Sequence, residues 1–256
     1  MSRLEQYKHS FPNVMLERSS DGVLEVTFHT NREKLVFNGH THEQFPNLFH
    51  QIGEDPENRV VILTGSGNAF MDSMSPEGFD FFTPRGYDKI FREGRKVLMN
   101  LLDVDVPMIA ALNGPVLLHS EYVLLCDIVL ATPDTVFQDQ PHAAFGIAPN
   151  DGIHLLWPEI IGSIRGRYFI LTQQKLTADA AMQLGVVNEI VERPNLMERA
   201  RFLATNIAKQ PPLTSKYTRI GFTQRLRRLV DEGIGYGLAL EGITAAENAH
   251  VAKEVG

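Results

Sequence analysis

A histidine and an aspartate stand nine residues apart in the segment 137–152, FQDQPHAAFGIAPNDG. They are His142 and Asp151, and the glycine and prolines of this segment predict a loop that can fold back on itself. A neutral imidazole held by a carboxylate can take a proton from water or from a hydroxyl near neutral pH. The pair could equally form a hydrogen bond that only stabilises the loop, and Asp151-Gly152 could simply form a turn.

Three further ionisable side chains occur in apolar surroundings. His119 and Glu121 lie in the apolar run 116–125, and Glu241 lies in the sequence LALEG. A lone histidine in such a run is more often a core residue than a functional one. Glu121 is expected to be a polar position with a structural partner, outside the catalytic set. Glu241 would by default lie on a solvated helical face.

The composition is that of an ordinary globular protein of 256 residues, 43% hydrophobic and 21% charged. The net charge of −7 argues against a nucleic-acid or anionic-membrane partner. The single cysteine, Cys126, excludes an intrachain disulfide, and the pair His40 and His42 lacks a further metal ligand at a recognisable spacing. We therefore expect no metal site. Without an export signal or an apolar run of about 18 residues, we expect a cytoplasmic protein with no membrane span.

Short apolar runs alternate with helical patterns along the chain. Strands are predicted at 24–28, 59–64, 106–112 and 128–131. Helices are predicted at 40–53, 87–102, 157–171 and 177–184, the third broken near Ile161-Gly162-Ser163, and the chain from 195 onward reads as helical. This alternation makes an α/β layer fold the expectation.

The segment 68–84 reads as an aromatic loop. It contains Phe70, Phe79, Phe81 and Phe82. Such a loop could form the wall of an apolar pocket or a packed surface cover, and the local sequence favours neither.

Two long stretches resemble the crotonase (enoyl-CoA hydratase/isomerase) superfamily. They are VPMIAALNGPVLLHSEYVLLCDIVLATPDTVFQDQPHAAFGIAPNDG at 106–152 and IGSIRGRYFILTQQKLTADAAMQLGVVNEIV at 161–191. With RVVILTGSG upstream, the resemblance covers most of residues 23–191. It implies an α/β fold with a spiral core of ββα turns over residues 1–194. A C-terminal helical region, 195–256, would serve oligomerisation and cap the active site, and the assembly would be a homotrimer or a dimer of trimers.

The departures from the superfamily pattern bear on function. Members that use coenzyme A carry glycines after the NG turn and after the AF pair, and their backbone N–H groups form an oxyanion hole. Here these places read LLHS at 117–120 and MDSM at 71–74, without glycine. One hydratase glutamate has a counterpart at Glu121, and the other is replaced by His142. The departures argue against coenzyme A binding.

The same departures resemble the β-diketone hydrolase branch of the superfamily, typified by 6-oxocamphor hydrolase. The matching words include VFQDQPH, GIAPNDG and NGPVLLHSE. The resemblance nominates a polar site of His119, His142, Asp151 and Glu241. It places Phe37 and Phe79 along the pocket, and Phe82 of the aromatic loop is expected to join them in binding substrate. The typical enzyme has a tryptophan where Phe37 stands, so we expect a pocket of different shape.

The resemblance implies a retro-Claisen cleavage of a C–C bond in a small-molecule β-diketone. His142 would deprotonate water, Asp151 would orient its ring, and His119 would stabilise the oxyanion or enolate. Glu241 would hold the water or tune the histidines. We expect no metal and no organic cofactor, because the second carbonyl accepts the electrons.

Two other functions stay open. The chain could be an enoyl-CoA hydratase or isomerase that uses Glu121 or His142, or a non-catalytic scaffold with the crotonase fold. The missing glycines oppose the first alternative, and the complete polar set opposes the second.

Overall fold

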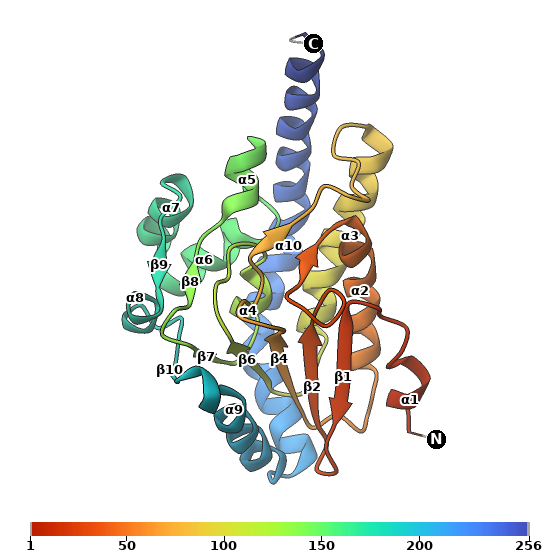
Figure 1. The fold of residues 1–256 in the computed structure, drawn as a ribbon, viewed down its shortest axis with the longest axis vertical. Coiled ribbons are helices and arrows are strands. Elements are labelled where there is room, and N and C mark those ends of the chain that lie inside the picture. The colour runs from red at the N-terminus through yellow and green to blue at the C-terminus, as the bar shows by residue number, and fades with distance from the viewer. Residues whose placement is uncertain (1, 255–256) are drawn as a thin grey trace.

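The structure is a computed structural model that describes residues 2–254, and a mixed β-sheet runs through it (Figure 1). In this part of the chain six strands form the sheet, in the spatial order β1 (Val14–Arg18), β2 (Val23–Phe28), β4 (Val60–Gly65), β6 (Met108–Leu112), β7 (Ile128–Ala131) and β10 (Glu189–Ile190). β1 runs antiparallel to β2, and the other neighbours are parallel. β4 and β6 are almost wholly buried because both faces of a parallel sheet are covered.

Helices and two small sheets surround this central sheet. The helices are α1 (Leu4–Tyr7), α2 (Gly39–Gly53), α3 (Pro84–Leu102), α4 (Glu121–Leu124), α5 (Gln140–Phe145), α6 (Ile153–Ile161), α7 (Ser163–Leu171), α8 (Ala178–Gln183), α9 (Arg193–Ala208) and α10 (Pro212–Glu254). The small sheets pair β3 (Val36–Phe37) with β5 (Ser73–Met74), and β8 (Val136–Phe137) with β9 (Leu176–Thr177).

Alternate residues of each strand face opposite sides of the sheet, so the sheet separates two apolar clusters. Leu63 of β4 belongs to the larger cluster, together with Phe49 of α2 and Leu98 of α3. Its neighbour Ile62 belongs to the smaller cluster, together with Leu196 of α9. The larger cluster supports the elements that carry the ionisable residues described below.

Several contacts hold the long helix α10 to the rest of the fold, and two of them bear on the site. The buried Arg219 donates a hydrogen bond from Nε to Asp127 Oδ2 at 2.8 Å. Further along, Gly237 allows a close approach, since a Cβ at this position would lie 2.3 Å from His154 Cε1. These contacts fix the position of Glu241, one helical turn later. Figure 1 shows α10 in blue, extending past α3 toward the C-terminus.

The α/β fold predicted from the sequence is confirmed, with a parallel-rich sheet and a long C-terminal helix. Two segments predicted to be loops contain short elements instead: α5 lies within 137–152, and β5 lies within 68–84. Pro141 suits the first turn of α5, and Gly146 ends the helix with a φ of 62°. Among the described helices, none combines the length and the apolar character needed to cross a membrane.

Candidate active site

A cavity lies among α3, α4, α5 and α10, and its wall combines ionisable with apolar side chains. The ionisable residues are His42, His119, Glu121, Asp139, His142, Asp151 and Glu241. The apolar wall includes Met74, Phe79, Phe81, Ile90, Val97, Leu118, Phe145 and Leu238. The cavity measures about 60 Å³.

His142 lies in α5, and its two ring nitrogens have different surroundings. Its Nδ1 is 2.8 Å from Oδ1 of Asp139, which precedes the first residue of α5. Its Nε2 is 3.8 Å from Asp151 Oδ2 and 3.9 Å from Glu241 Oε2. A carboxylate can only accept, so Nδ1–H donates to Asp139 and Nε2 is left to face the other two carboxylates.

This geometry corrects the expectation that Asp151 orients the ring of His142. Asp139 has that position, and Asp151 lies opposite, beyond hydrogen-bond distance. The difference follows from α5, because a helical turn brings residues three apart onto one face. The chain then turns back after Gly146 and places Asp151 on the Nε2 side. Asp139 was not among the site residues predicted from the sequence.

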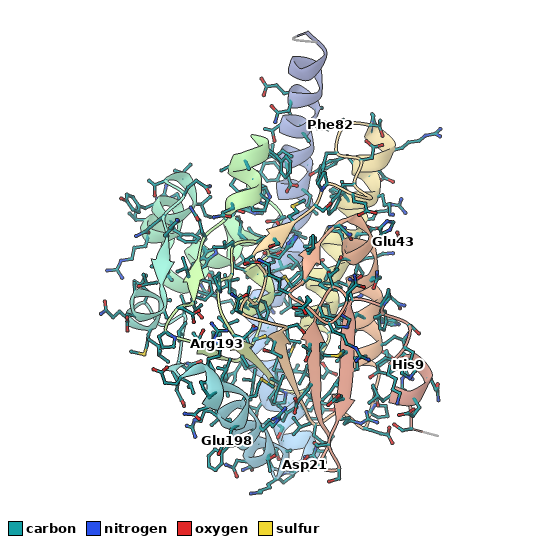
Figure 2. The ribbon with its side chains drawn as sticks, viewed as in Figure 1. His9, Asp21, Glu43, Phe82, Arg193 and Glu198 are labelled. Atoms are coloured by element: carbon teal, nitrogen blue, oxygen red, sulfur yellow. The ribbon has the colours of Figure 1, made fainter. Side chains whose placement is uncertain are left out.

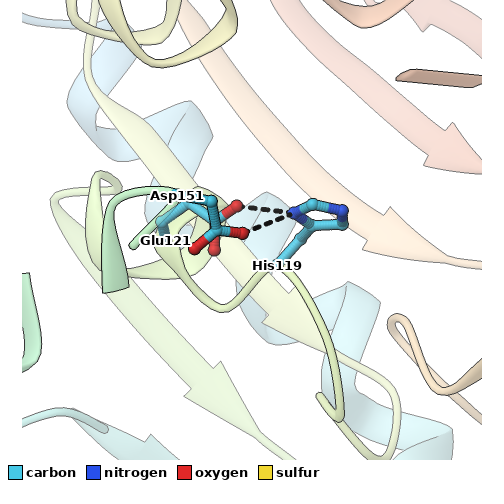
Figure 3. A group of neighbouring side chains, drawn as sticks. All are labelled: His119, Glu121 and Asp151. Atoms are coloured by element: carbon cyan, nitrogen blue, oxygen red, sulfur yellow. Dashed lines mark hydrogen bonds and ion pairs between the residues drawn. The ribbon is translucent and has the colours of Figure 1, made fainter. Parts of the chain in front are cut away.

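His119 is the second histidine of the cavity, and its backbone is unusual. Its φ is 50°, a left-handed conformation that side-chain-bearing residues rarely adopt. The ring packs against Phe37, with centroids 4.2 Å apart, and stacks on Tyr122 at 5.3 Å with planes 8° apart. Its Nδ1 lies 2.7 Å from Glu121 Oε1 and 3.7 Å from Asp151 Oδ2 (Figure 3). Glu121 therefore has a partner, as predicted, but that partner lies in the cavity.

Asp151 lies between the two histidines, and Glu241 enters from α10. Asp151 Oδ2 is 3.7 Å from His119 Nδ1 and 3.8 Å from His142 Nε2. The structure thus brings together all four polar residues nominated from the sequence. Four carboxylate oxygens around the cavity are buried without a hydrogen-bond partner among the described residues: Glu121 Oε2, Asp139 Oδ2, Asp151 Oδ1 and Glu241 Oε2.

The carboxylates raise the pKa of both histidines. Burial alone would lower the pKa of His142, but the charge of Asp151, the hydrogen bond to Asp139 and the nearby Glu241 raise it well above its usual value. Burial likewise opposes the charged form of His119, and Glu121 and Asp151 outweigh it, so that pKa is also raised.

The pKa values of the carboxylates are shifted in opposite directions. Burial and the neighbouring Asp151 raise the pKa of Glu121 to about 7. Burial also raises the pKa of Glu241, and the nearby His142, which favours the charged carboxylate, only partly offsets this rise. Asp151 differs, because His142 and His119 together outweigh its burial and lower its pKa. Asp151 is therefore the carboxylate of the three that keeps its negative charge most firmly.

His42 is a site residue that the sequence interpretation missed. Its Nδ1 lies 2.8 Å from Glu93 Oε2, and its ring contacts Phe37 and Phe79 edge-on. Burial lowers its pKa, so the ring favours the neutral form. The helical spacing offered a signal, since His42 and Phe45 are three residues apart and share the inward side of α2.

The three aromatic residues expected to bind substrate lie in different places. Phe37 is fully buried behind the ring of His119, and Phe79 lines the cavity. Phe82 does not line it: the residue is 55% exposed and is labelled near the start of α3 in Figure 2. It borders a neighbouring hollow of about 700 Å³ between the start of α3 and α10. Phe81 lines both spaces and stacks on Phe79 with ring centroids 4.7 Å apart.

Comparison with known proteins places this fold and site in a family context. The model of the enoyl-CoA hydratase/isomerase family matches residues 18–236. A probable peroxisomal enoyl-CoA hydratase of Arabidopsis thaliana is 30% identical over 250 residues, covering 93% of this chain and 85% of that protein. A short-chain-enoyl-CoA hydratase of Clostridium acetobutylicum is 28% identical over 229 residues, covering 88% of this chain and 86% of that protein.

Solved structures give a second comparison. A β-diketone hydrolase from the cyanobacterium Anabaena sp. PCC 7120, bound to (S)-3-oxocyclohexyl acetic acid, is 55% identical with a TM-score of 0.94, covering 94% of this chain and 97% of that one. An enoyl-CoA hydratase/isomerase from Mycobacterium paratuberculosis is 24% identical with a TM-score of 0.83, covering 95% of this chain and 98% of that one. The second likeness concerns the fold alone.

Proposed function

Because the chain belongs to the enoyl-CoA hydratase/isomerase family, we propose that it is a family member that hydrolyses a C–C bond of a β-diketone. The observation that carries this proposal is the arrangement at His142. Its Nδ1 is held by Asp139, and its Nε2 faces Asp151 and Glu241 across a gap of 3.8 to 3.9 Å. The similarity to the Anabaena β-diketone hydrolase supports the same activity.

The gap beside His142 fits one water molecule. Hydrogen bonds to water are about 2.8 Å long, so a single water can contact atoms that lie 3.8 to 3.9 Å apart. That water would donate to His142 Nε2 and to a carboxylate oxygen of Asp151 or Glu241. It would then be held with a lone pair free for attack, close to the base that takes its proton.

The reaction proceeds in three steps that balance without a cofactor. His142 Nε2 takes a proton from the water while the oxygen attacks one carbonyl carbon, which gives a tetrahedral oxyanion. The C–C bond next to that carbon then breaks, and its electron pair moves into the second carbonyl as an enolate. The proton on Nε2 passes to the enolate carbon, and the product is a keto acid. Asp139 stabilises the imidazolium formed in between.

His119 lies across Asp151 from His142 and supplies the electrophilic contact. Its Nδ1 is engaged by Glu121, so Nε2 is the atom that can donate to a substrate oxygen. A donor aimed at the developing oxyanion stabilises the transition state, and its removal costs roughly 3–4 kcal/mol in comparable sites. His42 and Phe79 contact each other in the same wall and would border the diketone ring.

Acyl-CoA hydration is the second candidate, and the curated relatives favour it. The geometry offers it less support. The carboxylate that would correspond to a hydratase glutamate, Glu121, is only 2% exposed, and its Oε1 is occupied by His119. The stretch 117–120 lacks the glycines that resembling coenzyme A enzymes use.

A pair of assays separates the two functions. (S)-3-Oxocyclohexyl acetic acid is the keto acid that ring opening of a symmetrical bicyclic 1,3-diketone gives, so that diketone is a suitable probe. Purified protein should convert it to the keto acid, as followed by chromatography, and should leave crotonyl-CoA unchanged. Hydration of crotonyl-CoA without cleavage of the diketone would contradict the proposal.

We also propose that the chain assembles as a homotrimer or a dimer of trimers. Large apolar side chains are exposed on α7 and α10, including Ile164, Leu171 and Phe222 at 72%, 81% and 77%. Such side chains mark surfaces that another subunit can cover. Light scattering should give three or six times the chain mass of 28.7 kDa, whereas a monomer would contradict this assembly.

A further inference from the structure

Glu121 is a buried carboxylate that takes no direct part in the reaction described above. It is the first residue of α4, and its side chain is 2% exposed. Its Oε1 contacts His119 Nδ1 at 2.7 Å, and its Oε2 has no hydrogen-bond partner among the described residues. Removing a carboxylate from water is unfavourable unless another interaction offsets the loss. The contact with His119 is the interaction that can do so.

The surroundings of His119 leave one ring atom available. Phe37 packs against the ring at a tilt, Tyr122 stacks on it, and Glu121 accepts the hydrogen bond from Nδ1–H. An imidazole that keeps a proton on Nδ1 can donate from Nε2 only when it is doubly protonated. The partner at Nδ1 therefore decides whether His119 can bind a carbonyl oxygen through Nε2–H.

We propose that Glu121 is a positioning residue for the β-diketone cleavage, which holds His119 as an imidazolium with Nε2–H directed to the substrate oxygen. This inference rests on the proposed function. The left-handed backbone of His119, with a φ of 50°, supports it, because a rare conformation persists at a site where the surroundings enforce it. The contacts with Glu121, Phe37 and Tyr122 hold His119 in that conformation.

Neither of the other charged groups near His119, Asp151 and His142, can replace Glu121 in stabilising the imidazolium. Asp151 Oδ2 also faces Nδ1, but at 3.7 Å it makes no hydrogen bond. His142 opposes a second positive charge, and Glu121 with Asp151 outweighs it. Loss of Glu121 would leave the ring with a distant carboxylate, which is also shared with His142.

The kinetic test replaces Glu121 by glutamine, which keeps the shape of the side chain and removes its charge. A charge-assisted hydrogen bond is lost, so kcat on the bicyclic 1,3-diketone should fall about 10- to 100-fold. KM should stay within about threefold, because the contact matters mainly in the transition state. The control is Glu43→Gln, which removes an exposed carboxylate paired with Lys89 and should leave kcat unchanged.

A second measurement needs no substrate. Nitrogen-15 spectra of the histidine side chains, recorded near pH 7, should show both nitrogens of His119 protonated in the wild-type protein. In Glu121→Gln the ring should become neutral, while the signals of His142 persist. His119→Gln assigns the signals, and circular dichroism verifies folding of each variant.

The two measurements separate the possible failures. A neutral His119 in the wild-type protein, or an unchanged imidazolium and unchanged kcat in Glu121→Gln, would overturn the role of Glu121. Should Glu121→Gln not fold, the wild-type spectrum still decides. Absence of diketone cleavage by the wild type would refute the proposed function instead, and the spectra would still report on the Glu121–His119 pair.

Discussion

Of the three histidines that line the cavity, His119 and His142 are each held at Nδ1 by a carboxylate of the polar site, and they differ in what surrounds the other nitrogen. In both, Nδ1 is held by a carboxylate, Asp139 for His142 at 2.8 Å and Glu121 for His119 at 2.7 Å. The Nε2 atom of His142 faces two more carboxylates, whereas the ring of His119 lies between aromatic rings. The same side chain can thus serve water activation on one side and carbonyl binding on the other.

Removal of His142 tests the base side of this comparison and should have the largest effect. His142→Ala deletes the group that takes the proton from water, so kcat on the bicyclic diketone should fall about 10²–10⁴-fold. Stopped assays with chromatographic detection of the keto acid measure this loss. Wild-type turnover by a folded His142→Ala protein would show that another group is the base.

Removal of His119 tests the carbonyl side and should rank second. His119→Ala deletes a donor to the oxyanion, so kcat should fall about 10²–10³-fold. Unlike the His142 variant, this protein keeps its base, and the pH at which its rate is half-maximal should shift little. A loss confined to KM would instead assign His119 to ground-state binding.

Asp139 tests whether the partner at Nδ1 tunes the base. His142 acts as a base only when neutral, and its pKa is raised, so the rate should rise with pH through a midpoint above the ordinary histidine value. Asp139→Asn removes one cause of the raised pKa, so the midpoint should move to lower pH. Loss of the negative charge that stabilises the imidazolium should also lower kcat about 10- to 100-fold. An unmoved midpoint would contradict the coupling.

Asp151 and Glu241 also face His142 and also raise its pKa. They remain in Asp139→Asn, so the midpoint should stay above the value of a free histidine. Asp103→Asn, which removes an exposed carboxylate paired with Arg227, is the matched control and should leave the profile unchanged.

Substitutions in the aromatic wall should have the smallest effect on activity, and they allow the neighbours Phe81 and Phe82 to be compared directly. Phe81 lines the cavity and stacks on Phe79 and Phe145, whereas Phe82 borders only the adjacent hollow. Phe81→Ala should change kcat/KM for diketones by up to about tenfold, because apolar pocket contacts discriminate weakly. Phe82→Ala should leave kcat/KM unchanged. Equal effects of the two variants would show that both side chains border the substrate.

The sequence predicted the sheet well because its signals are local. Continuous apolar runs identified β4 and β6, and these strands are buried on both faces. The family resemblance nominated His119, His142 and Asp151, and the structure places all three at the cavity.

Contacts that depend on a particular turn were not predicted. Asp139 reaches His142 only because α5 forms, and the prolines and glycine of that segment had indicated a loop. His42 was dismissed as a metal ligand, and its role in the cavity wall depends on the packing of α2 against the aromatic loop. Phe82 was expected in the pocket because the resemblance places substrate beside the aromatic loop, and a resemblance of this kind does not tell which side chains of the loop face the cavity.

Hydrolysis of the bicyclic 1,3-diketone in oxygen-18 water tests the central claim most directly. Water attack on one carbonyl, followed by C–C cleavage, places one oxygen-18 atom in the carboxyl group of the keto acid. Mass spectrometry of the product from the wild-type protein should show this single label, and a folded His142→Ala protein should form almost none. An unchanged diketone, or a keto acid without label in its carboxyl group, would contradict the account.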